Sequence, residues 1–136
     1  RPIADRHRNI LEESAMLERL RWSAQSIAQP SAVQIALFPE FVEVADELAL
    51  GWEEAIHDLK GICTHLQPAQ IAAIEELDAF MASISGQSHA QLWTMDALKT
   101  SPEWQTLREL ANQVLEQMLW PKTPPSVRSD IYVTHR

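Results

Sequence analysis

The sequence is poor in the residues that build several common kinds of site. Its 136 residues include one cysteine and three glycines. A single cysteine cannot form a disulfide within the chain, and it excludes a metal site made of several cysteines. Three glycines are too few for a phosphate-cradling loop, and no glycine motif of a nucleotide-binding protein or a hydrolase occurs. These absences disfavour an enzyme, and we expect no cofactor.

Long apolar runs are also missing. None approaches the roughly 18 residues typical of a membrane-spanning helix, so we expect no membrane segment. Residues 1–6 lack the apolar stretch of a secretion signal. Scarce cysteine is typical of a reducing compartment, and we therefore expect a cytoplasmic location. A hydrophobic fraction of 46% is typical of a folded chain, and the length fits a single domain.

Positive charge is nearly absent from the middle third of the chain. The net charge is −8 overall, but it is +1 over residues 1–38, −9 over residues 39–80 and 0 over residues 81–136. In the middle segment ten acidic residues face Lys60 alone. An acidic balance disfavours a nucleic-acid binder, which usually presents a basic face. It suits a protein that meets a basic protein partner.

Helical periodicity dominates what is present. Hydrophobic residues recur every three or four positions through four long segments, which are residues 3–28, 39–60, 68–85 and 101–119. Ser101, Pro102 and Glu103 form a strong helix start. Thr94 predicts the cap of a short helix to residue 98. Ser31 and Gln34 suggest a capping box for another, which we prefer to a strand over residues 33–37.

These segments predict an all-α fold. We expect an antiparallel bundle of four main helices with one or two short extra helices and an extended C-terminal tail. Residues 1–120 would form a single helical domain. Residues 121–136, which contain three of the eight prolines, would form the tail.

The helix predicted over residues 39–60 carries the main candidate site. Its outer side gathers acidic residues within about 60° of one another, with one leucine beside them and two further acids flanking. The five acids are Glu40, Glu43, Glu47, Glu54 and Asp58, the leucine is Leu50, and the flanking acids are Asp46 and Glu53. Carboxylates three and four residues apart repel each other. This side is either a solvated face, neutralised in part by Arg19 and Arg21, or a docking surface with Leu50 as its apolar anchor.

Trp22 is the other candidate for binding a partner. It lies off the main apolar stripe of its helix, beside Leu11 and Ala15. Tryptophan is enriched at interface hot spots. Trp22 would contact the tail, a second subunit or a different protein. A homo-oligomer held by this stripe, or by the tail around Tyr132, is therefore an alternative.

A catalytic site or a metal-binding site has less support in the sequence. Glu54 and His57 have an E-x-x-H spacing, but a di-iron bundle needs two such pairs facing the core, and here there is one pair on the polar side. Cys63 follows an apolar residue and is expected to be a buried, inert thiol. We expect no metal site. A small metal-dependent or ligand-binding enzyme remains the second alternative.

The leading functional prediction is a non-enzymatic, acidic protein-binding domain. Its most concrete form is an immunity protein or antitoxin that neutralises a basic toxin or nuclease. That form rests on analogy with small acidic helical proteins.

Overall fold

The computed structural model describes residues 3–59 and 65–127, with side chains from residue 13 onward. Cys63, Tyr132 and the side chain of Leu11 lie outside this part, so the predictions made for them stay untested. Every regular element in the described residues is a helix. In chain order they are α1 (Ile3–Ala28), α2 (Ser31–Ala36), α3 (Val44–Leu59), α4 (Pro68–Ser83), the 3₁₀-helix η2 (Gln87–Leu92), α5 (Met95–Thr100) and α6 (Pro102–Met118).

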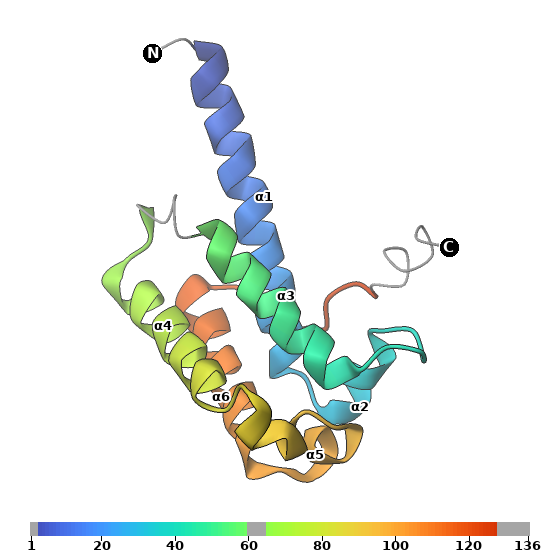
Figure 1. Ribbon diagram of the computed structural model, residues 1–136. Coiled ribbons are helices and arrows are strands. Elements are labelled where there is room, and N and C mark those ends of the chain that lie inside the picture. The colour runs from blue at the N-terminus through green and yellow to red at the C-terminus, as the bar shows by residue number, and fades with distance from the viewer. Residues whose placement is uncertain (1–2, 60–64, 128–136) are drawn as a thin grey trace.

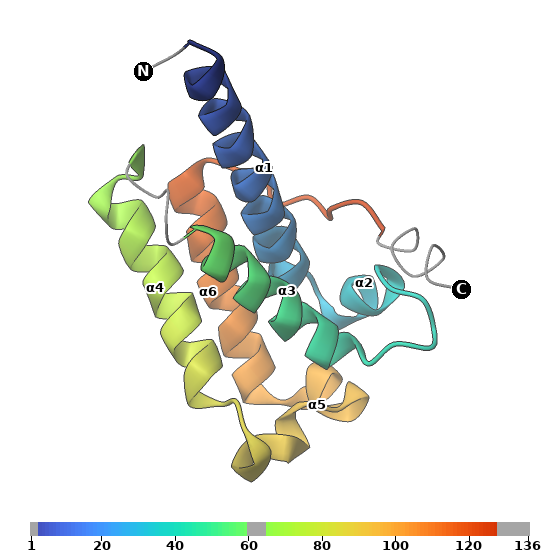
Figure 2. The ribbon, with the colours of Figure 1, turned by 45° about the horizontal axis from the view of Figure 1, so that its top comes forward.

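Four long helices form the antiparallel bundle that the sequence predicts (Figures 1 and 2). α1 descends, α3 returns beside it, α4 descends again and α6 ascends between α4 and α1. The short elements α2, η2 and α5 close one end of the bundle, and the N-terminal turns of α1 project beyond the other end. The all-α prediction is therefore confirmed.

Two helix starts follow their predicted capping signals. The Ser101 hydroxyl accepts a hydrogen bond from the Trp104 backbone N–H at 3.1 Å, and Pro102 occupies the first turn of α6. The Thr94 hydroxyl caps α5 in the same way through the Ala97 N–H at 3.1 Å. These side chains satisfy N–H groups that have no partner inside a helix.

α3 begins later than the sequence analysis predicts. Leu37 and Phe38 are buried after α2, and the chain then reverses in a turn where the Val42 N–H donates to the Pro39 carbonyl at 3.3 Å. Helix α3 therefore starts at Val44 rather than at residue 39. A helix over residues 39–60 would place Phe41 on its apolar side, but Phe41 lies in this turn and is 65% exposed.

The base of the bundle is held by a polar network rather than by the predicted capping box. Gln34 is fully buried, and its side-chain amide donates to the carbonyls of Ser26 at 3.2 Å and Ile27 at 2.9 Å, near the end of α1. Its side-chain oxygen accepts a hydrogen bond from Arg108 at 3.0 Å. The capping-box prediction for Ser31 and Gln34 is thus wrong, because Gln34 caps the preceding helix instead.

Arg108 of α6 completes this network. Its guanidinium donates to the carbonyls of Gln29, at 3.1 Å, and Leu98, near the ends of α1 and α5. Burial lowers the pKa of this guanidinium from its usual value. A cation at the C-terminal end of a helix interacts favourably with the helix dipole. Arg108 therefore supplies the positive charge that the last turn of α1 lacks.

The core contains two fully buried tryptophans, Trp52 and Trp104, as the apolar stripes predict. The Trp52 indole N–H donates to Asp78 of α4 at 3.1 Å, and the Trp104 indole N–H donates to the Leu92 carbonyl at 2.8 Å. Trp93 packs edge-on against Trp104, with ring centroids 5.6 Å apart. Each buried indole thus has a partner for its donor as well as an apolar environment.

After α6 the chain is extended. Leu119 adopts a left-handed conformation with φ 58°, which ends the helix. Residues 120–127 then run without helical structure alongside α1, as predicted for this part of the tail, and residues 128–136 of the predicted tail lie outside the described residues.

Candidate docking surface on α3

α3 is fixed so that its polar side faces outward. Its buried side consists of Val44, Ala45, Leu48, Trp52, Ala55 and Leu59. The contact between Trp52 and Asp78 joins α3 to α4, and the buried side packs against α1. Rotation of the helix would move apolar residues into water, so its exposed residues keep their orientation.

Leu50 occupies the middle of the outward side and is 47% exposed. It lines two neighbouring open hollows. The first, of about 550 Å³, lies between α3 and η2 and has Asp46 and Glu53 on its α3 side. The second, of about 510 Å³, is lined by Leu50, Glu53, Glu54, His57 and Asp58. We call these six α3 residues the acidic surface: Asp46, Leu50, Glu53, Glu54, His57 and Asp58.

Arginines neutralise only one end of the acidic surface. Arg19 of α1 approaches Asp58 of α3, with Nη2 3.0 Å and Nε 3.1 Å from Oδ2. Arg21 instead pairs with Glu18 on its own helix at 2.7 Å. Of the two arginines that the sequence offers for neutralising the acids of α3, only Arg19 pairs with one of them. Within the described part of the chain, Glu53 and Glu54 form no salt bridge.

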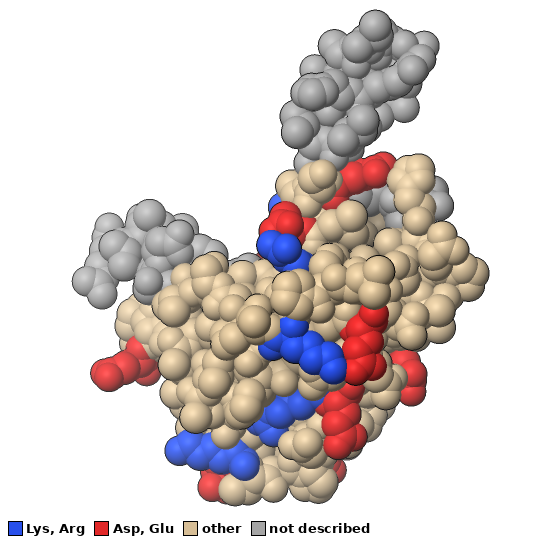
Figure 3. All heavy atoms as spheres, turned by 180° about the vertical axis from the view of Figure 1, so that it is seen from behind, with Lys and Arg blue, Asp and Glu red and all other residues tan. Residues whose placement is uncertain are grey.

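Charge is distributed differently on the far side of the molecule. Figure 3 shows that side, where lysine and arginine groups lie next to aspartate and glutamate groups. Lys122 and Glu116, both outside α3, form an ion pair at 2.6 Å. α3 itself contains no lysine or arginine between its first and last residues. Of the ten acids that the sequence places in residues 39–80, five therefore lie on α3, three on α4 and two in the turn before α3.

The predicted site residues do not all come together. Glu40 and Glu43 lie in the turn before α3 rather than on the helix, so their placement on a continuous acidic face is corrected. Glu47 lies on α3 but lines neither hollow. Leu50, Glu54 and Asp58 lie close together as predicted.

The η2 side of the first hollow was missed by the sequence analysis. Gly86, Gln87, Ala90 and Trp93 line it. These residues follow α4 and meet α3 only through the tertiary fold. The pattern of residues within α3 predicts which side of the helix faces outward. It does not predict which other element lies beside that side, so no signal in the sequence reveals the η2 residues that line the hollow.

Trp22 lies away from the acidic surface. Its indole N–H donates to the Ser126 carbonyl at 2.8 Å, and its ring packs edge-on against Phe38 with centroids 6.0 Å apart. Among the contacts proposed for Trp22, the one with the tail is therefore formed. Ala15, its predicted neighbour in the stripe, is exposed.

The remaining cavities offer less room. A hollow of about 160 Å³ between α3 and α4 is lined by Ile56, Leu59, Leu66, Ile71 and Ile74, with Glu75 and Asp78 at its edge. Sites for small molecules usually measure about 300–1,000 Å³, so this one is small. Glu54 and His57 are both exposed, and the described residues contain no group of three or more metal-ligating side chains.

Comparison with known proteins adds no further constraint. No protein family, curated protein or solved structure matches this chain. Among the described helices, none is both long and apolar enough to cross a membrane.

Proposed function

We propose that this chain is a non-enzymatic protein-binding domain that docks on a basic protein through the acidic surface of α3. The observation that carries the proposal is the position of Leu50. A half-exposed leucine lies between two hollows whose α3 sides carry Asp46, Glu53 and Glu54. An apolar anchor beside uncompensated charge is the arrangement that protein interfaces use for affinity and steering together.

The charges and the leucine would have separate roles. Carboxylates of one sign raise the rate at which a basic partner arrives, because their field attracts it over roughly a Debye length. Leu50 would enter an apolar depression on the partner and slow dissociation. The two open hollows beside Leu50 would receive partner side chains, and basic ones would meet Glu53 and Glu54 there.

In its most concrete form the proposal is a neutralising protein. An immunity protein or antitoxin covers the basic site of a toxin or nuclease, and an acidic surface on a rigid bundle suits that task. Both proteins would then meet in a reducing, cytoplasmic compartment. This form extends the proposal by analogy, and identification of the partner decides it.

A capture experiment with matched charge variants tests the proposal. The tagged full chain is incubated with lysate of the source cells at low and high salt, and the captured proteins are quantified by mass spectrometry. We expect a basic protein that is captured at low salt and lost at high salt. The double substitution Glu53→Lys with Glu54→Lys should reduce its capture at least about tenfold.

The control moves the same charge change to another helix. Glu75→Lys with Glu76→Lys alters two neighbouring exposed acids of α4 and leaves α3 untouched. Capture should fall much less in this control. Equal loss in both variants would show that overall charge alone governs binding, and unchanged capture in the α3 variant would refute the docking surface.

Leu50→Ala tests the apolar anchor. We expect faster dissociation of the captured partner with little change in its association rate. Met95→Ala is the matched control, because Met95 is also a partly exposed apolar residue but lies on α5. A Leu50→Ala variant that dissociates no faster than the control would remove the leucine from the proposal.

A further inference from the structure

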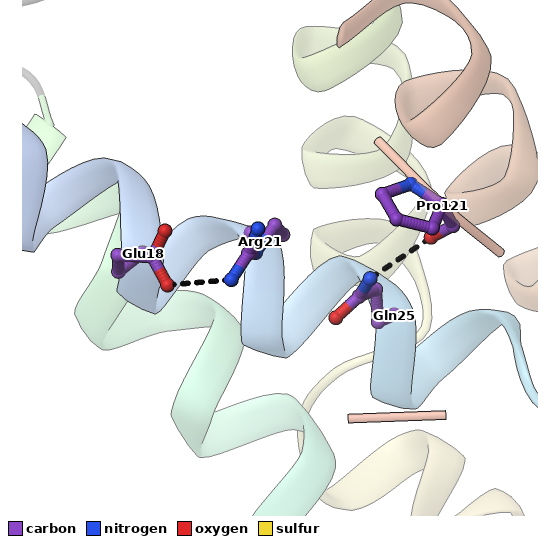
Figure 4. Close-up of polar contacts among 4 residues, drawn as sticks. All are labelled: Glu18, Arg21, Gln25 and Pro121. Carbon is purple, nitrogen blue, oxygen red and sulfur yellow. Dashed lines mark hydrogen bonds and ion pairs between the residues drawn. The ribbon is translucent and has the colours of Figure 1, made fainter. Parts of the chain in front are cut away.

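A second surface lies along α1, where the C-terminal segment of residues 120–127 is bound. Three α1 side chains donate to its backbone carbonyls. The bonds are Trp22 Nε1 to Ser126 at 2.8 Å, Gln25 Nε2 to Pro121 at 2.9 Å and Gln29 Nε2 to Lys122 at 3.0 Å. Figure 4 shows Gln25 pointing from α1 toward Pro121. We call the α1 face with these three donors the α1 groove.

The α1 groove recognises backbone rather than side chains. All three acceptors are main-chain carbonyls, so the bonds require an extended chain of the right path and not a particular sequence. The donors are three and four residues apart, which places them in one row along the helix. Any extended segment that presents carbonyls along this row can form the same bonds.

The prolines of residues 120–127 favour the extended conformation in which this segment lies along the α1 groove. Pro121, Pro124 and Pro125 belong to the segment, and residues 120–127 contain no helix. Proline fixes φ near −65° and favours the extended polyproline II conformation, so little conformational entropy remains to be lost on binding. A segment that lacked these prolines would lose more entropy on entering the same path.

Trp22 supplies the aromatic part of the groove. Its ring is held edge-on against Phe38, with centroids 6.0 Å apart, while its N–H faces the segment. A hollow of about 360 Å³ is left between α1 and the segment, and it is lined by Trp22, Pro124 and Pro125 together with Glu18 and Arg21. Figure 4 shows the Glu18–Arg21 ion pair along the same helix as Gln25. An aromatic ring beside prolines is the usual means of binding polyproline II segments.

We propose that the α1 groove is a binding site for an extended, proline-containing protein segment, and that residues 120–127 are an internal occupant which a partner's segment displaces. Such a segment would form the same three carbonyl bonds and place prolines beside Trp22. The α1 groove and the acidic surface share no residues, so this inference is independent of the proposed function.

Nuclear magnetic resonance of the ¹⁵N-labelled full chain tests the displacement. The probe is a synthetic peptide with the sequence of residues 120–127. The internal occupant has an effective concentration in the millimolar range, so the peptide is titrated to several millimolar. A Pro124→Gly with Pro125→Gly variant, titrated in parallel, weakens the internal occupant by making it more flexible. Circular dichroism checks that both proteins are folded.

The expected result is exchange of one segment for the other. The Trp22 indole signal, assigned by its absence in Trp22→Phe, should shift and stay hydrogen-bonded, while backbone signals of residues 122–127 move toward unstructured positions. The peptide should bind the glycine variant at least about tenfold more tightly than the unaltered chain. A peptide with alanine at all three proline positions should bind at least about tenfold more weakly.

A pair of glutamine variants separates recognition from general effects. Gln25→Ala is introduced into the glycine variant, where the weakened internal segment competes less; there it removes one donor of the α1 groove and should weaken peptide binding about fivefold. Gln105→Ala in the same glycine variant, at an exposed glutamine of α6, should leave peptide binding unchanged. No shift of the Trp22 indole in either protein at several millimolar peptide would overturn the proposal. Equal binding of the alanine peptide, or no difference between the two glutamine variants, would also overturn it.

Discussion

α3 and α1 bury one side each in the same core, but they use their other sides in opposite ways. α3 turns carboxylates outward, and within the described residues Glu53 and Glu54 form no salt bridge. α1 turns neutral donors outward, and Trp22, Gln25 and Gln29 all find carbonyl acceptors in the segment of residues 120–127. The α3 side adds little to stability, whereas the α1 side contributes to it directly.

This difference separates residues whose placement points to function from residues whose placement stabilises the fold. Mutual repulsion among the α3 acids is unfavourable for the isolated chain, so their concentration calls for an explanation outside the fold. The hydrogen bonds of α1 are each worth about 1 kcal/mol net and are explained within the fold. Salt should weaken what the acidic surface does and leave the α1 contacts nearly unchanged.

The largest effect is expected from Trp22→Ala. The change removes the bond to Ser126 and the ring contact with Phe38. We expect the free energy of unfolding to fall by about 2 kcal/mol and the melting temperature to fall by roughly 6 °C. Thermal unfolding followed by circular dichroism measures this. Capture of the basic partner should persist, and its loss would mean that the two surfaces are not separate.

A smaller effect of opposite sign is expected from Leu119→Gly. Leu119 holds a left-handed conformation at φ 58° and is 89% exposed, so its side chain contributes little packing. Glycine adopts this conformation without steric cost, and stability should rise by about 0.5–1 kcal/mol. Gln113→Gly, at an exposed position inside α6, should instead lower stability by about 1 kcal/mol. Chemical denaturation measures the free energy of unfolding of both variants. A lower value for Leu119→Gly than for the unaltered chain would contradict the expected relief of backbone strain.

The smallest effect on stability is expected from Arg19→Ala, which removes the pair with Asp58. Because the two side chains are 45% and 36% exposed, the loss should stay below about 0.5 kcal/mol. The acidic surface becomes more negative, so association with the basic partner at low salt should become roughly twofold faster. Surface plasmon resonance measures this rate. Arg21→Ala removes the same charge beside Glu18 and should change the rate less, so slower association in Arg19→Ala would count against steering by α3.

Local signals in the sequence predicted much of the fold. The start of α6 at Ser101 and Pro102 followed from capping chemistry, and the buried positions of Trp52 and Trp104 followed from periodicity. Such signals depend on residues that are close together in the sequence, so they can be recognised without knowing which helices pack against each other. The start of α3 was misplaced because burial of Leu37 and Phe38 after α2 requires a turn, and that requirement comes from packing between helices.

The candidate sites were predictable only in part. Charge along one helix pointed to Glu54 and Asp58, and Leu50 was identified as the apolar residue among them. The ion pair of Arg19 and the η2 wall of the first hollow depend on which helices are neighbours, and periodicity does not determine this. In the α1 groove only Trp22 was identified from the sequence, with the tail among its expected contacts. The bonds of Gln25 and Gln29 left no signal, because backbone carbonyls accept them and every residue has one.

The network around Arg108 makes the closed end of the bundle a single cooperative unit. One guanidinium binds carbonyls near the ends of α1 and α5 and the side chain of Gln34 in α2. None of these three segments can fray alone without leaving the half-buried guanidinium without one of its partners. Amide protons there should therefore exchange with solvent together and slowly, although α2 and α5, with six residues each, are too short to be stable in isolation.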